Sequence, residues 1–293
     1  MESAIRCRGN KMLVENTLLG TYDKVQIAID RLREFEPSEG YYLAFSGGKD
    51  SIVVEHLADL AGVKYETHFS MTTVDPPEVL HFIERYNGVH WHRPEKTMFQ
   101  LIIKKGPPTR LNRFCCMYLK ETGGIGRLVV TGVRWQESVK RKARRMIELC
   151  YKEKSKSFLH PIIDWTEDDV WEFINLYKLP YCSLYDEKNS SEHCLLNRKI
   201  AKRIDCVGCN MKQCRLWSFN RIGCVLCPMQ TNEGRKRDIE RFPNFARAYI
   251  RAFGKMLEVK KDRKNWKTAE DVMAWWIGDQ PYREEETLFS KYE

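Results

Sequence analysis

The sequence predicts an α/β protein with a doubly wound parallel sheet, on the basis of three observations. Strand-like apolar runs alternate with helix-like segments along most of the chain, as in parallel sheets whose strands are joined by helices. A glycine loop at residues 46–51 joins one such strand to one such helix. Two polar segments, Thr73–Asp75 and Gly132–Arg134, also follow predicted strands, so all three are expected to converge at the carboxyl edge of the sheet.

The first half of the chain shows this alternation most clearly. A helix is predicted from Thr21 because several apolar side chains fall on one face, namely Val25, Ala28, Ile29 and Leu32. The turn residues at 37–40 end that helix. The elements expected next are a strand at 41–45, a helix to about 61, a strand at 65–71, a helix after Pro76–Pro77, a strand at 90–92 and a helix at 98–104.

The second half continues the pattern and then changes character. A helix is expected to open at 115–120, and strands are expected at 127–132 and 161–163. Thr166 is a good N-cap for a helix with an acidic first turn. These features predict an N-terminal segment (1–20), an α/β nucleotide-binding domain (21–186), a cysteine-rich metal-binding segment (187–234) and a helical C-terminal region (235–293).

The loop Ser46-Gly47-Gly48-Lys49-Asp50-Ser51 has the chemistry of an anion site. Glycines let backbone N–H groups close on a phosphate, and the N-terminus of the following helix adds a partial positive charge. Lys49 adds a full charge, and the two serines offer hydroxyl donors. The spacing is not that of the Walker motif.

Composition bounds the class of protein. Of the 293 residues, 43% are hydrophobic, which is enough for a core. No apolar run approaches the roughly 18 residues of a membrane span, and the first residues lack the apolar centre of a signal peptide. We therefore expect a soluble, cytoplasmic protein with no membrane partner.

The eleven cysteines favour metal binding, since disulfides are rare in a reducing compartment. Four of them have the spacing of a tetrathiolate site: Cys194, Cys206, Cys209 and Cys214. Zinc is the first interpretation of this group, and a second iron–sulfur cluster is the alternative. His193 is an alternative ligand to Cys194.

Basic residues exceed acidic residues by 49 − 40 = 9, and the excess is local. Residues 188–221 hold eight basic and two acidic side chains, and residues 140–145 form a second basic run. Such clusters bind phosphate backbones, so nucleic acid is a candidate partner. The alternatives are solubility and contact with a polyphosphate substrate.

Several motifs, in this order, resemble the phosphoadenosine/adenosine phosphosulfate reductase family. They are the loop at 46–51, which resembles the PP-loop, the double cysteine in Arg113–Lys120, the arginine motif Gly132–Ser138, the segment Leu184–Asp186, and Arg221–Pro228. Together they span about residues 21–260. The resemblance implies the fold of the PP-loop ATP pyrophosphatases, within the adenine nucleotide α-hydrolase-like (HUP-like) superfamily.

The resemblance also implies ligands and roles. A 4Fe-4S cluster would be held by Cys115, Cys116, Cys224 and Cys227, and four thiolates are the usual set for it. Alternatively, the inserted cysteines share one cluster with Cys224 and Cys227. Lys49 and Arg134 would be catalytic, acting on the nucleotide phosphates, with Arg141 in support. Thr73 and Asp75 would contact adenosine, although Asp75 could instead cap the helix at Pro76.

The leading functional hypothesis is an adenylating ATP pyrophosphatase acting in sulfur transfer. It would use ATP with Mg²⁺, a sulfur donor protein and an acceptor, for which nucleic acid is a candidate. No cysteine follows Cys227, whereas the family's reductases use one near the C-terminus. Reduction of adenylyl or phosphoadenylyl sulfate is therefore the second hypothesis. A non-catalytic subunit that binds nucleotide and nucleic acid is the third.

Overall fold

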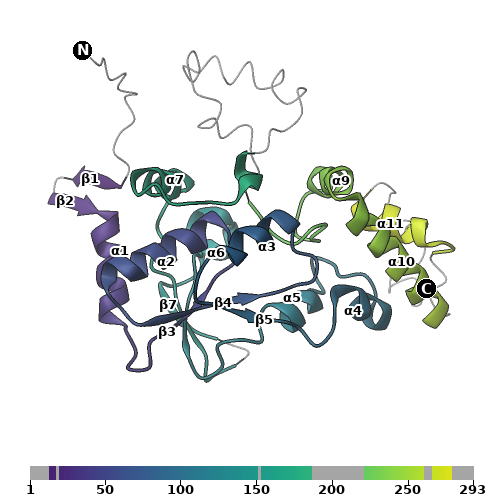
Figure 1. Ribbon diagram of the computed structural model, residues 1–293, viewed down its shortest axis with the longest axis horizontal. Helices are drawn as coiled ribbons and strands as arrows, with labels where there is room; N and C mark the ends of the chain where they lie inside the picture. The colour runs from purple at the N-terminus through teal and green to yellow at the C-terminus, as the bar shows by residue number, and fades with distance from the viewer. Residues whose placement is uncertain (1–12, 18–19, 151–152, 187–220, 261–265, 279–293) are drawn as a thin grey trace, which may run out of the picture. The chain divides into compact units, whose positions relative to one another are not determined.

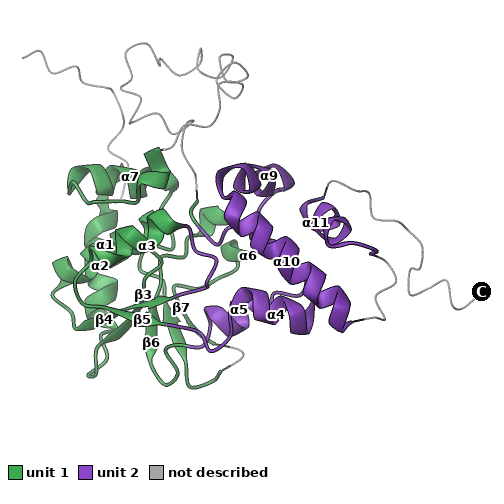
Figure 2. Cartoon of the chain, turned by 45° about the vertical axis from the view of Figure 1, so that its right-hand side comes forward, with its two compact units in different colours: residues 1–70, 77–92, 123–222 green, residues 71–76, 93–122, 223–293 purple. Residues whose placement is uncertain are grey.

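The computed structural model describes residues 13–17, 20–150, 153–186, 221–260 and 266–278, and Figure 1 labels most of their helices and strands. The chain forms two compact units that interleave along the sequence (Figure 2). Unit 1 comprises residues 1–70, 77–92 and 123–222, and unit 2 comprises residues 71–76, 93–122 and 223–293. The domain boundaries expected near residues 20, 186 and 234 stay predictions.

Unit 1 contains all the strands of the described residues. Its elements are β1 (Val14–Thr17), β2 (Gly20–Asp23), α1 (Lys24–Glu34), β3 (Tyr41–Ala44), α2 (Lys49–Ala61), β4 (Tyr65–Ser70), α3 (Pro77–Glu84), β5 (Val89–His92), β6 (Leu128–Val130), the 3₁₀ helix η1 (Trp135–Glu137), α6 (Val139–Lys142), β7 (Ile147–Leu149), β8 (Ser157–Leu159), α7 (Glu167–Leu176) and the 3₁₀ helix η2 (Ser183–Asp186). Helix α2 packs against both α1 and α7.

The main sheet of unit 1 has the strand order β5-β4-β3-β6-β8-β7. The chain runs outward from β3 through β4 to β5, then returns to the other side of β3 with β6 and β8. The strand order therefore reverses between β3 and β6, which is where doubly wound sheets bind ligands. All neighbouring pairs are parallel except β7 and β8, which are antiparallel.

The predicted α/β class and most of the predicted elements are confirmed, and the sheet differs from the prediction in several places. The sheet is mixed rather than wholly parallel, because β7 turns back along β8. The strand expected at 161–163 lies in a turn, and the strand itself is β8 at Ser157–Leu159. Strands β1, β2 and β7 were not predicted. The helix predicted from Thr21 begins at Lys24 instead, because residues 21–23 belong to β2 and Asp23 caps the helix.

Helix boundaries follow local chemistry. The Asp23 carboxylate accepts hydrogen bonds from the first-turn N–H groups of Val25 and Gln26 and begins α1. Thr166 caps α7 as predicted, in a reciprocal capping box with Asp169. These caps fix where each helix starts and therefore where its first-turn side chains lie.

Unit 2 is helical and contains α4 (Met98–Lys105), α5 (Phe114–Leu119), α9 (Asn232–Arg241), α10 (Pro243–Val259) and α11 (Ala269–Ile277). Tyr249 on α10 packs against Phe99 and Trp276, with ring centroids 5.3 and 4.9 Å away. The Trp276 indole N–H donates to the Pro108 carbonyl at 2.7 Å, so this core is also tied by a buried hydrogen bond. Within the described residues, every helix is too short or too polar to cross a membrane.

Candidate functional site

The glycine loop lies between β3 and α2, as predicted, at the point where the strand order reverses. Gly47 has a φ of +67°, which L side chains rarely adopt. A Cβ at Gly47 would lie 3.0 Å from Ile83 of α3, so a side chain would also crowd the packed core. Gly48 is the N-cap of α2 and has no side chain to accept the first-turn hydrogen bonds. The loop is therefore closely packed, and its helix N-terminus favours a bound anion.

The two serines of the loop hold its shape. The Ser46 N–H donates to Ser51 Oγ at 3.2 Å, and Ser51 Oγ donates to the Gly48 carbonyl at 2.8 Å. The Gly48 N–H in turn donates to Ser46 Oγ at 3.4 Å. Both hydroxyls thus have loop partners, which makes the serines framework residues of the predicted anion site.

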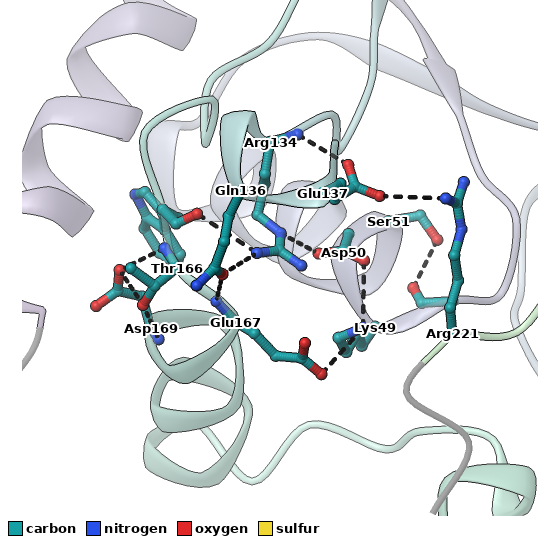
Figure 3. Close-up of polar contacts among 12 residues, drawn as sticks. Lys49, Asp50, Ser51, Arg134, Gln136, Glu137, Thr166, Glu167, Asp169 and Arg221 are labelled. Carbon is teal, nitrogen blue, oxygen red and sulfur yellow. Dashed lines mark hydrogen bonds and ion pairs between the residues drawn. The ribbon is translucent and has the colours of Figure 1, made fainter. Parts of the chain in front are cut away.

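Arg134, which follows β6, reaches the first turn of α2. Its Nε donates to Asp50 Oδ1 at 2.6 Å, and its side chain is only 3% exposed (Figure 3). Gly132 makes this approach possible, since a Cβ there would lie 2.8 Å from the Asp50 backbone. This contact therefore brings together three predicted site residues from the two sides of the strand reversal: Lys49, Asp50 and Arg134.

Lys49 is buried, although it lies on the predicted phosphate loop. It is 2% exposed. Its Nζ lies 3.7 Å from Asp50 Oδ2 and 3.7 Å from Glu167 Oε1, and 5.5 Å from the centre of the Tyr185 ring. The lysine charge is thus held inside the site, between two carboxylates.

The site also includes residues that were not predicted from the sequence, among them Gln136, Glu167 and Tyr185. Gln136 Oε1 accepts from Arg134 Nη1 at 3.3 Å and from the Glu167 N–H at 2.5 Å (Figure 3). The Tyr185 hydroxyl accepts from the Lys49 N–H at 3.0 Å, and burial raises the pKa of that phenol. Tyr185 lies in the motif Leu184–Asp186, which could have drawn attention to it. Gln136 likewise lies in the motif Gly132–Ser138 and Glu167 in the acidic first turn of α7, but no local signal indicated their contacts with Arg134 and Lys49.

Arg141 extends the positive charge of the site. Its guanidinium pairs with Glu137, and Arg221 Nη1 lies 3.7 Å from the same carboxylate. Burial lowers the pKa of Arg141, and with the charges of Arg221 and Arg144 this brings it to about 10. A guanidinium destabilised by neighbouring cations is stabilised by an added anion, so this part of unit 1 is suited to phosphate.

Thr73 and Asp75 belong to unit 2, so their roles as adenosine contacts stay predictions. The Asp75 carboxylate accepts from the Thr72 N–H at 2.6 Å, and Thr73 Oγ1 accepts from the Met98 N–H at 3.0 Å. Thr73 has a φ of +65°. In this structure both side chains shape the segment that follows β4.

The cysteines of the motifs at 113–120 and 221–228 all lie in unit 2. Cys115 and Cys116 are on α5, and Cys224 and Cys227 are joined by a turn in which the Cys227 N–H donates to the Cys224 carbonyl. Val225 pairs with Val74 through a backbone hydrogen bond of 2.8 Å. The two cysteine pairs come from separate parts of the sequence and belong to one compact unit, and their role as cluster ligands stays a prediction.

The four thiols affect one another electrostatically. A hydrogen bond with Cys116 is the largest cause that raises the pKa of Cys115, and Cys224 and Cys227 raise it further. The same hydrogen bond lowers the pKa of Cys116 to about 6, aided by Lys120. Attraction to Cys224 raises the pKa of Lys120.

No group of three or more His, Cys, Asp or Glu side chains in the described residues has the arrangement needed to hold a metal ion. Cys194, Cys206, Cys209 and Cys214, together with His193, lie outside the described residues. The iron–sulfur and zinc assignments therefore stay predictions.

Comparison with known proteins identifies related chains. The family described as the phosphoadenosine phosphosulfate reductase domain matches residues 40–230. An uncharacterized protein of Methanocaldococcus jannaschii is 26% identical over 71% of this chain and 46% of its own length. A probable FAD synthase of Caenorhabditis elegans is 28% identical over 58% of this chain and 32% of its own. An adenosine 5′-phosphosulfate reductase of Staphylococcus haemolyticus is 29% identical over 40% and 55%.

A solved phosphoadenylyl-sulfate reductase from Candida auris aligns with 54% of this chain and 83% of its own, at 18% identity and a TM-score of 0.42. The chain spans between 32% and 55% of the length of the three relatives named above. The relatives with a named activity are enzymes.

Proposed function

The chain belongs to the phosphoadenosine phosphosulfate reductase domain family, and from that premise we propose that it is an adenylating enzyme of sulfur metabolism. In this proposal the loop at 46–51 binds the phosphates of ATP, and the enzyme cleaves ATP between its α- and β-phosphates. The observation that carries the proposal is the convergence of Lys49, Arg134 and Arg141 with the N-terminus of α2, at the reversal of the strand order.

Each cation has a distinct part in this proposal. Arg134 is held by Asp50 through Nε, and its guanidinium offers further N–H donors to a phosphate. Lys49 supplies a point charge beside the loop. A bound phosphate would offset the repulsion between Arg141 and its neighbouring arginines. Thr73 and Asp75 are proposed to contact the adenosine.

The proposed reaction is a displacement at the α-phosphorus. An acceptor oxygen forms the new bond to phosphorus, the bond from phosphorus to the bridging oxygen breaks, and pyrophosphate leaves with that electron pair. Sulfide delivered by a donor protein then forms a bond to the acceptor atom that carries the adenylyl group, and AMP leaves with its oxygen and the electron pair of the broken bond. Positive groups that stabilise the developing charge on pyrophosphate lower the barrier, and Lys49 and Arg134 are the candidates for this role.

Magnesium fits the donor chemistry of the site. Mg²⁺ prefers carboxylate and phosphate oxygens, and the Asp50 and Glu167 carboxylates both lie beside the loop lysine. When bound with ATP, the ion would neutralise phosphate charge.

An iron–sulfur cluster fits the cysteines of unit 2. Cys115, Cys116, Cys224 and Cys227 would hold a 4Fe-4S cluster through their thiolates, and the charge of Lys120 would offset part of the negative charge of those thiolates. The cluster would supply redox or sulfur-handling chemistry. The cysteines at 194, 206, 209 and 214 are proposed to bind zinc or a second cluster.

A nucleic acid is the proposed acceptor. Support comes from the segment that follows Arg134, in which Lys140, Lys142 and Arg145 are exposed. The exposed Trp135 precedes them, and its indole N–H donates to the Arg144 carbonyl at 2.8 Å. Basic side chains beside an exposed aromatic ring are typical of single-strand binding surfaces.

Reduction of adenylyl sulfate is the second candidate function. The four cysteines and the adenosine 5′-phosphosulfate reductase of Staphylococcus haemolyticus favour it. The two candidates differ in products: the first releases pyrophosphate and AMP from ATP, and the second releases sulfite and AMP from adenylyl sulfate.

The test supplies each substrate to anaerobically purified protein. The proposal expects pyrophosphate when ATP, Mg²⁺, a nucleic acid and sulfide are present, and no sulfite from adenylyl sulfate with a thiol. Lys49→Ala should weaken pyrophosphate binding about tenfold or more, because a charged hydrogen bond is lost. Sulfite without pyrophosphate would establish the second candidate, and unchanged pyrophosphate affinity in Lys49→Ala would contradict the loop assignment.

A further inference from the structure

A carboxylate from a distant part of the chain lies beside the loop lysine. Glu167 Oε1 is 3.7 Å from Lys49 Nζ, although 118 positions separate the two residues in the sequence (Figure 3). The lysine side chain is 3% exposed, and that of Glu167 is 37% exposed. The buried cation therefore has a carboxylate partner that is partly exposed to solvent.

The backbone of Glu167 is fixed while its carboxylate is not enclosed. Its N–H donates to Gln136 Oε1 at 2.5 Å. The start of α7 is held by the capping box of Thr166 and Asp169, and Asp169 pairs with Lys24 at 3.0 Å. Rotation of the Glu167 side chain alone would therefore move the carboxylate away from Lys49 without displacing the helix.

The second carboxylate beside Lys49 is more constrained. Asp50 Oδ1 accepts from Arg134 Nε at 2.6 Å, and the aspartate side chain is 20% exposed. Asp50 is also within the first turn of α2, so it moves only with the loop. Of the two acids, Glu167 is the one that an incoming anion could replace.

We propose that Glu167 is an internal substitute for a phosphate group, which neutralises Lys49 when no nucleotide is bound and is displaced by the polyphosphate of the nucleotide. This inference rests on the proposed function of the same site. It makes Glu167 a specificity-determining residue, since only ligands that place an anion on Lys49 overcome the competition. A ligand binds only those molecules in which Glu167 does not occupy the phosphate position. The apparent affinity therefore falls in proportion to that fraction.

The experiment measures binding of inorganic pyrophosphate by calorimetry, at low ionic strength and in EDTA. Glu167→Gln removes the competing charge but keeps the size and the helix cap. Pyrophosphate should then bind about two- to fivefold more tightly, the range expected for loss of a partly exposed ion pair. Glu167→Asp, which keeps the charge on a shorter side chain, should give an intermediate affinity.

Two controls separate this role from a general change in charge. Glu84→Gln on α3 removes an exposed charge in the same unit and should leave the affinity unchanged. In a Lys49→Ala background, Glu167→Gln should have no further effect, because the competition needs the lysine. Circular dichroism melts confirm that every variant is folded.

The outcomes are distinct. Equal or weaker pyrophosphate binding by folded Glu167→Gln overturns this inference while leaving the nucleotide site in place. An equal gain in affinity in Glu84→Gln, or in the Lys49→Ala background, also overturns it. Failure of the wild-type protein to bind either pyrophosphate or ATP overturns the proposed function and this inference together.

Discussion

Arg134 Nε lies 2.6 Å from Asp50 Oδ1, and this contact joins the segment after β6 to the helix after β3. The two strands are neighbours in the sheet, and the chain leaves them in opposite directions along it. A charged hydrogen bond thus bridges the place where a doubly wound sheet binds its ligand. The same aspartate faces Lys49, so one carboxylate organises both candidate phosphate ligands.

Replacing Asp50 by Asn should destabilise the protein. The change removes a negative charge beside the buried Arg134 and Lys49, and loss of a charged hydrogen bond should lower the free energy of unfolding by about 1–3 kcal/mol. Urea denaturation measures this difference. Added pyrophosphate should stabilise the variant more than the wild type, because the anion replaces the lost charge.

The control for that prediction is Asp30→Asn on α1, where the exposed carboxylate accepts a hydrogen bond from the Gln26 side chain at the surface. Its effect should stay within about 0.5 kcal/mol. Equal unfolding free energies for wild type and Asp50→Asn would contradict the organising role of Asp50.

Replacing Gly132 by Ala should disturb both stability and the site. The new Cβ would lie 2.8 Å from backbone atoms of Asp50, and backbone cannot move aside as a flexible side chain can. Overpacking of this kind costs about 1–3 kcal/mol, and pyrophosphate affinity should fall because Arg134 follows two residues later. Thermal melts and calorimetry measure the two effects.

Gly254→Ala is the matched control for this substitution. Gly254 is within α10, and a Cβ there would meet Ala269 at an ordinary 3.8 Å. Alanine should stabilise the helix by about 0.5–1 kcal/mol. If Gly132→Ala proved as stable as the wild type and bound pyrophosphate equally well, the close approach of the two segments would not matter for the site.

Stability should depend on pH through Glu55 of α2. Burial raises the pKa of this carboxyl group to about 7, from an ordinary value of 4.5. Between these two values the folded state holds a proton that the unfolded state has lost, so the contribution of Glu55 to stability is lost as pH rises from about 4.5 to 7. Glutamine does not titrate, so the stability of the Glu55→Gln variant does not fall for this reason as pH rises.

Urea denaturation at several pH values from 5 to about 8 tests the point. The difference in unfolding free energy between Glu55→Gln and wild type should grow in favour of the variant as pH rises. Glutamine keeps an oxygen that can accept the 3.0 Å hydrogen bond from Thr67 Oγ1, so the comparison isolates the charge. A difference that is constant with pH would show that Glu55 titrates normally.

Metal analysis tests the cysteines of unit 2. Anaerobically purified protein should contain about four iron and four sulfide per chain, with the absorbance of a 4Fe-4S cluster. Cys224→Ser should lose most of both, whereas Cys150→Ser, a half-buried cysteine of unit 1, should keep them. Full iron content in Cys224→Ser, or zinc alone in the wild type, would contradict the cluster.

The sequence by itself determined the features whose physics is local. Gly47 and Gly48 after an apolar run predict a strand, an anion loop and a helix, because backbone freedom and hydrophobic period are encoded by neighbouring residues. Thr166 before an acidic turn predicted the start of α7 for the same reason. The sequence motifs alone also indicated Asp50 and Arg134 as site residues.

Only the tertiary structure decided which distant groups meet. Gln136, Glu167 and Tyr185 join the site through contacts with Arg134 and Lys49, and no local pattern shows that a particular glutamate will face a lysine 118 positions away. The burial of Lys49 and the antiparallel β7 depend likewise on packing between remote segments. Local periodicity specifies helices and strands, but long-range packing specifies the environment of each charge.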